Sequence, residues 1–140
     1  MAPTNLRDRL ARIPDLDADV AFRNLGGKLA SLDRVMRTFA LTYGDGLPAL
    51  IANNHESVES VARSRSICHS LRGASTALGA GRVGAMALAL ECELRDSPPN
   101  SGERAMRREL HEAVLTLVGH VTLAINSRDV SELLWPMSVS

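Results

Sequence analysis

The chain has 140 residues and a mass of 15.1 kDa, enough for one folded unit with a substantial apolar core. Apolar residues make up 45% of it and charged residues 23%, and 16 Lys plus Arg balance 16 Asp plus Glu, so no net charge draws it to nucleic acid or to acidic lipid. No apolar run approaches the roughly 20 residues of a membrane span, and no signal peptide is apparent. We therefore expect a cytoplasmic protein that binds neither nucleic acid nor a membrane.

In the N-terminal third of the chain, the sequence predicts an extension or linker followed by two helical regions. Residues 1–12 are expected to be an N-terminal extension or linker, although Leu6 and Leu10 have helical spacing. A short helix is predicted over 17–25, with Asp17 as its N-cap and Gly26 after its end. An amphipathic helix is predicted over 28–53 from apolar residues spaced by three or four, which glycines and a proline at 44–48 are expected to bend or briefly break.

Three more helices are predicted over 56–78, 82–96 and 101–128, separated by short turn-rich stretches. Long amphipathic helices with short connections are typical of an antiparallel bundle. The sequence thus predicts an all-α fold, an antiparallel four-helix bundle with a short additional N-terminal helix, over 13–128. Residues 129–140 are expected to form a C-terminal tail.

The predicted helix 56–78 carries the most chemical information. Its core stripe is expected to contain Val58, Val61, Ala62, Cys68, Leu71, Ser75 and Leu78. The adjacent face, at the margin of the core, is expected to hold Arg65, His69, Arg72, Gly73 and Thr76.

Two interpretations of that face are open from the spacing alone. A glycine inside a helix costs about 1 kcal/mol against alanine, so Gly73 calls for a reason. Helical side chains lean toward the N-terminus, so a side chain at 73 would lie over His69, whereas glycine leaves the imidazole accessible. Arg72 supplies positive charge one turn from His69, where a bound anion would lie. The alternative is a solvated histidine beside a glycine that serves packing.

Residues 68–80, Cys-His-Ser-Leu-Arg-Gly-Ala-Ser-Thr-Ala-Leu-Gly-Ala, resemble the His-x-Leu-Lys-Gly-x-Ser-x-x-Leu-Gly-Ala signature of histidine-containing phosphotransfer (HPt) domains of bacterial phosphorelays. Segments 13–17, 22–27 and 87–91 resemble weaker motifs of the same family, so the resemblance covers about 13–128. The central motif is specific, and the flanking ones are weak alone.

The resemblance implies roles for individual residues. His69 would be the phosphorylated residue, Arg72 would stand at the lysine position, and Gly73 would be the small residue beneath the phosphoryl group. Glu91 would lie near enough to orient the imidazole. Arg65 and Thr76, on the same face, are expected to contact the partner: Arg65 one turn before His69 and Thr76 two turns after it.

Some positions depart from the family pattern. Arginine replaces the commoner lysine at 72, which keeps the charge and changes the donor geometry. Lys28 stands where an acidic residue is usual, and 53–56 replaces the family's acidic turn. None of these changes removes the acceptor histidine.

The function implied by the resemblance is that of a phosphorelay carrier without an ATP site or cofactor of its own. It would exchange a phosphoryl group with a receiver domain of a response regulator, which would supply Mg²⁺, or take it from a sensor or hybrid histidine kinase. Two alternatives share the same face: the histidine-bearing domain of a chemotaxis-type kinase, and a helical adaptor that binds its partner without phosphorylation.

The remaining candidate groups point to structural roles. No pair among the histidines and cysteines has the spacing of a metal site, so no metal is expected. His111 and His120 are expected on or beside the surface of the last helix, and Cys68 in the core. The glycine-rich stretch 79–84 is only a partial match to a nucleotide-binding pattern and is interpreted as a turn between helices.

Overall fold

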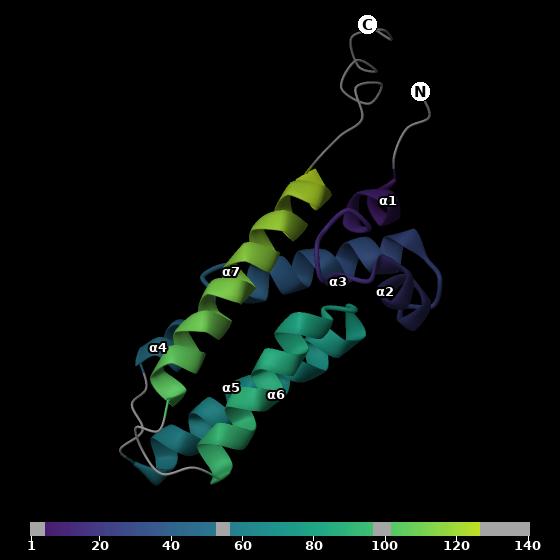
Figure 1. The fold of residues 1–140 in the computed structure, drawn as a ribbon. Helices are drawn as coiled ribbons and strands as arrows, with labels where there is room; N and C mark the ends of the chain where they lie inside the picture. The colour runs from purple at the N-terminus through teal and green to yellow at the C-terminus, as the bar shows by residue number, and fades with distance from the viewer. Residues whose placement is uncertain (1–4, 53–56, 97–101, 127–140) are drawn as a thin grey trace, which may run out of the picture.

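The computed structural model describes residues 5–52, 57–96 and 102–126, and this part of the chain is helical (Figure 1). It contains seven helices: α1 (Leu6–Leu10), α2 (Ala18–Asn24), α3 (Leu29–Thr42), α4 (Pro48–Ala52), α5 (Val58–Ala77), α6 (Gly81–Asp96) and α7 (Glu103–Asn126). The expected all-α class is confirmed. The expected tail at 129–140 and the turn at 53–56 lie outside the described residues.

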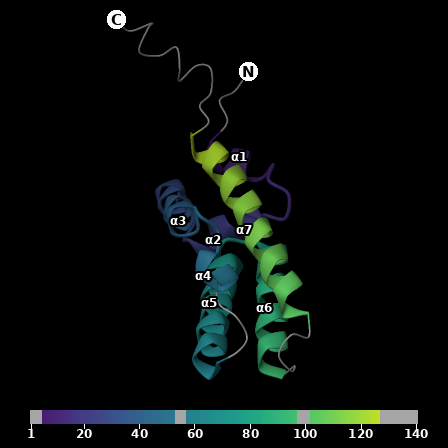
Figure 2. The same ribbon diagram turned by 90° about the vertical axis from the view of Figure 1, so that its left-hand side faces the viewer.

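The long helices do not all run along one axis. α5 and α6 form an antiparallel pair with the most extensive contact in the fold, and α7 lies alongside α6. Helix α3 lies across this group: its axis is steeply inclined to α5 and α6 in both views (Figures 1 and 2). The helix predicted over 28–53 is interrupted at 44–48, as expected: α3 ends at Thr42 and α4 begins at Pro48. A four-helix bundle is therefore not confirmed.

Local capping explains where two of these helices begin. The Asp17 side chain accepts a hydrogen bond from the Val20 amide at 3.1 Å, which confirms the predicted N-cap of α2. Ser57 caps α5 by accepting from the Ser60 amide at 3.0 Å. Each cap satisfies an amide that the first helical turn leaves without a partner.

Part of the segment expected to be an N-terminal extension or linker packs against the rest of the fold. Leu6 and Leu10 of α1 are buried in the same core as the long helices. Arg9 Nε donates to the Ala124 carbonyl at 2.8 Å, so α1 also closes the last turn of α7. Two leucines one turn apart are sufficient to bury one side of a short helix, although polar residues dominate its sequence.

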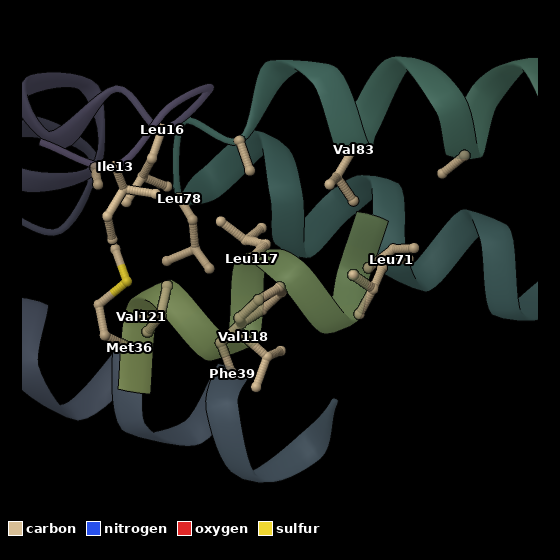
Figure 3. Packing of buried hydrophobic residues seen from close by; sticks show 14 of the residues in the cluster. Ile13, Leu16, Met36, Phe39, Leu71, Leu78, Val83, Leu117, Val118 and Val121 are labelled. Atoms are coloured by element: carbon tan, nitrogen blue, oxygen red, sulfur yellow. The ribbon is translucent and has the colours of Figure 1, made fainter. Parts of the chain in front are cut away.

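The core is built around α7 (Figure 3). Leu117, Val118 and Val121 of α7 lie between Met36 and Phe39 of α3 on one side and apolar side chains of α5 and α6 on the other. One helix thus joins the crossing helix to the antiparallel pair.

The start of α5 presents a different face to the core than expected. Val58 is 85% exposed and Ala62 is also exposed, whereas Ser60 and Ser64 are buried. The reason is the buried guanidinium of Arg107 on α7, which donates from Nη1 to the Ser64 hydroxyl and to the Leu50 carbonyl, both at 2.8 Å. A buried cation requires polar partners, so serines take the core-facing positions where valine and alanine were expected.

The turn between α5 and α6 is fixed against the segment before α2. The Asp17 amide donates to the Gly79 carbonyl at 2.9 Å, and Leu16 pairs with Ala80 in an isolated bridge. Gly79 has φ +72°, and a Cβ there would collide with the Asp17 backbone, so only glycine suits this turn. The end of the histidine-bearing helix is thereby held in place.

Within residues 5–52, 57–96 and 102–126, no helix has both the length and the apolar character of a membrane span.

Candidate functional site

His69 lies in the middle of α5, on the side that faces away from the core. Its side chain is 69% exposed, while the next residue toward the core, Cys68, is fully buried. The helix is long and capped at its start, so the backbone beneath the imidazole is regular. The structure therefore shows a histidine whose ring is accessible and whose backbone is part of a regular helix.

Glu91 of α6 approaches the imidazole from the neighbouring helix. Its Oε1 lies 3.7 Å from His69 Nδ1, and its Oε2 lies 3.6 Å from Arg72 Nη1. The Glu91 side chain is only 16% exposed, whereas that of Arg72 is 40% exposed. Both distances are within ion-pair range and slightly longer than hydrogen bonds, and Glu91 Oε2 makes no hydrogen bond. The three residues form one polar group, in which the carboxylate approaches the ring with one oxygen and the guanidinium with the other.

Gly73 has open space around it. A Cβ built at this position would meet no heavy atom of a neighbouring element or side chain within 4 Å. The hypothesis that Gly73 allows a close approach of two helices therefore has no support in the packing. Gly84 of α6, by contrast, faces α5: an added Cβ there would lie in van der Waals contact with the Ser75 side chain, at 3.6 Å.

The two residues expected to contact a partner flank His69 along α5. Thr76 is exposed, and its hydroxyl donates back to the Arg72 carbonyl at 2.8 Å. Arg65 is half-buried, and its Nε is buried without a hydrogen-bond partner. The same face thus holds all five residues predicted for it, and Glu91 joins them from α6.

Cys68 is placed as a core residue, as the sequence predicted. Burial raises the pKa of its thiol to about 12, and the negative charge of Glu91 acts in the same direction. The thiol therefore stays protonated at neutral pH and is a poor nucleophile.

The other histidines lie apart from this group. His111 of α7 is half-buried, and its Nδ1 accepts a hydrogen bond from the Leu47 amide at 2.8 Å, which fixes the segment before α4. His120 is exposed on α7, in agreement with its expected surface position. Among the residues that the structure describes, no three His, Cys, Asp or Glu side chains are placed to hold a metal ion.

Arg107 is a buried charged residue that the sequence analysis did not predict. It is buried at the base of the fold, and burial lowers the pKa of its guanidinium. The spacing of Arg107 with the buried Leu110 and Val114 (i, i+3, i+7) places it on the apolar stripe of α7, which could have signalled burial. Its bonds to α4 and α5 hold the helix that carries His69.

Comparison of the chain with known protein families, with characterised proteins and with solved structures found no match. The chemistry must therefore be argued from the site. The imidazole is accessible, a cation lies one turn away, the space at Gly73 is open, and a carboxylate lies near Nδ1. This arrangement suits the capture of a phosphoryl group on Nε2.

Proposed function

We propose that this protein is a phosphoryl carrier of the histidine-containing phosphotransfer kind, with His69 as the acceptor. The observation that carries the proposal is the arrangement around the ring: His69 is mostly exposed, and Glu91 lies 3.7 Å from Nδ1. Arg72 is one turn away, and the space at Gly73 is open. A packing glycine beside a solvated histidine would not account for the carboxylate or for the open space.

The proposed reaction is an exchange between His69 and an aspartyl phosphate. The Nε2 lone pair attacks phosphorus and forms the P–N bond, while the P–O bond breaks and its electron pair stays with the aspartate carboxylate. The proton on Nδ1 remains on the ring, on the nitrogen that lies 3.7 Å from Glu91 Oε1. Such contacts are often long in a resting site and tighten when the reactants meet. Arg72 is placed to neutralise charge on the transferred group.

The partner in this proposal is the receiver domain of a response regulator, with a sensor or hybrid histidine kinase as the source of phosphate. The receiver would contribute the aspartate and a Mg²⁺ ion, and this chain the nucleophile and its surroundings. In the same proposal, the four helices of the family's bundle correspond to α5, α6, α7 and the divided α3–α4 region. The protein would act in the cytoplasm.

Replacement of His69 by glutamine tests the proposal directly. The variant is expected to take up no phosphate from a phosphorylated receiver domain, because the only proposed acceptor is gone. Its melting temperature should stay close to that of the unmodified protein, since surface substitutions usually change stability by less than about 0.5 kcal/mol. The measurement is acid-labile phosphate on the purified chain. Wild-type labelling of the folded variant would contradict the assignment.

A further inference from the structure

Glu91 is a mostly buried carboxylate whose two oxygens face two different cations or potential cations. Oε1 lies 3.7 Å from His69 Nδ1 and Oε2 lies 3.6 Å from Arg72 Nη1. Oε2 is buried and makes no hydrogen bond. Buried polar atoms are nearly always hydrogen-bonded, so a carboxylate held just outside bonding distance of both neighbours calls for an explanation.

Arg72 has two possible anionic partners at this site. In the structure it pairs loosely with Glu91, from a side chain that is 40% exposed. A phosphoryl group on Nε2 of His69 would offer Arg72 a second, more highly charged anion one turn away along α5. Arginine binds phosphoryl oxygens in short, paired, charge-assisted hydrogen bonds, which a contact at 3.6 Å does not provide.

We propose that Arg72 exchanges partners when His69 is phosphorylated: its guanidinium gives up Glu91 and binds the phosphoryl oxygens. Glu91 thereby controls the lifetime of the phosphohistidine. This inference rests on the proposed function. In the resting protein Glu91 holds Arg72. In the phosphorylated protein Glu91 competes with the phosphoryl group for the same guanidinium, which weakens the stabilisation of the P–N bond and favours onward transfer. Glu91 acts through Arg72 and is therefore a positioning residue.

The proposal is tested on the protein alone, with phosphoramidate as the donor. Nε2 of His69 attacks phosphorus and forms the new P–N bond, while the donor's own P–N bond breaks and its nitrogen takes the electron pair and a proton to leave as ammonia. After removal of the donor, ³¹P NMR follows the decay of phosphohistidine. Four proteins are compared: wild type, Glu91→Gln, Arg72→Ala and the double variant. Glutamine keeps an oxygen that can accept from Nδ1–H but removes the competing charge.

The expected result is a lifetime that depends on both residues together. Release of Arg72 from an ion pair of this kind corresponds to about two- to fivefold in an equilibrium constant. Glu91→Gln should therefore lengthen the half-life of phosphohistidine about two- to fivefold when Arg72 is present. In the Arg72→Ala background the same change should have a clearly smaller effect.

A matched control is available in the pair formed by Asp15 and Arg82, which are also 3.6 Å apart but belong to the segment before α2 and to the start of α6. Asp15→Asn removes a carboxylate from an ion pair of the same length outside the His69 face, and it should leave the half-life unchanged. Thermal melting of each variant establishes that it is folded.

Two results would overturn the inference and can be told apart. An equal effect of Glu91→Gln in the wild-type and Arg72→Ala backgrounds would mean that Glu91 acts on the phosphoryl group or the ring without Arg72; the proposed function would then stand and the exchange of partners would not. A failure of every folded variant to acquire phosphate on His69 would remove the proposed function itself.

Discussion

At the scale of single residues, Gly73 raises the question of whether this part of α5 serves access to His69 or the stability of the helix. Glycine inside a helix is costly, and nothing packs against this position. A methyl group at 73 would touch no neighbour within the protein. A side chain there would instead meet a docking partner or the phosphoryl group. We expect that glycine is kept at this position for the approach to His69.

Gly73→Ala should stabilise the protein by up to about 1 kcal/mol, because alanine favours the helix and finds room. The same change should slow phosphoryl transfer, and Gly73→Gln should slow it far more, because a longer side chain leans back toward the imidazole. Melting temperature and transfer rate are measured on the same samples.

Gly119 of α7 provides the control for this prediction. It is also an exposed glycine inside a long helix with no neighbouring atom within 4 Å of an added Cβ. Gly119→Ala should raise stability by a similar amount and leave the transfer rate unchanged. Unaltered transfer by folded Gly73→Gln would rule out the access hypothesis.

At the scale of elements, α1 shows how a short polar segment becomes part of the core. Isolated helices of this length are unstable in water, so tertiary contacts must hold it. Arg7 pairs with Asp19 of α2 at 2.6 Å and lies over the Phe22 ring, with 4.3 Å from the guanidinium carbon to the ring centroid. Leu10 of the same helix is fully buried. The helix thus closes the end of the core formed by α2, α3 and α7.

Leu10→Ala should lower the free energy of unfolding by about 2–5 kcal/mol, the usual cost of deleting a buried leucine side chain and leaving a cavity. Leu41→Ala is the control, because Leu41 of α3 is 85% exposed and its removal should cost less than about 0.5 kcal/mol. Urea unfolding followed by circular dichroism measures both. Equal, small effects would show that α1 contributes little to folding.

At the scale of the whole molecule, the buried side chains of Ser64, Cys68 and Arg107 link the core to the helix that carries the candidate site. The charges of Glu91 and Arg107 act on the Cys68 thiol in opposite directions, and Arg107 donates hydrogen bonds to Ser64 and to the Leu50 carbonyl of α4. The helix that carries His69 is therefore held from below by polar contacts as well as by apolar packing. The free energy of unfolding should therefore depend on whether the Cys68 thiol is protonated.

Stability should fall at alkaline pH because of Cys68. Its thiol pKa is about 12 in the folded protein against an ordinary value of 9.0, so the unfolded chain releases this proton first. The contribution is complete below about pH 9 and is lost between about pH 9 and 12, at up to about 1.4 kcal/mol per pH unit.

The free energy of unfolding, measured by urea titration at pH 8, 9 and 10, tests this. Cys68→Ala should be less stable at pH 8 but should lose the decline that begins near pH 9. Burial also raises the pKa of Tyr43, so a decline that starts above about pH 10 should persist in the variant. Identical slopes from pH 9 to 10 in both proteins would contradict the assignment to Cys68.

The helices and the face that carries His69 follow from local information. The spacing of apolar residues predicts each long helix, and side chains such as Asp17 determine where a helix starts because a cap needs only its own first turn. Residues three and four apart share one face of a helix, so Arg65, His69, Arg72, Gly73 and Thr76 could be grouped without a structure.

The placement of elements far apart in the sequence was decided only by the tertiary structure. No local pattern shows that α3 crosses the other helices, where in the core Leu10 packs, or that Arg107 of α7 bonds to Ser64 of α5 and makes it face inward. The distances from Glu91 to His69 and Arg72 depend on how α6 packs against α5. Periodicity describes one helix at a time, whereas packing depends on the shapes and charges of all the helices together.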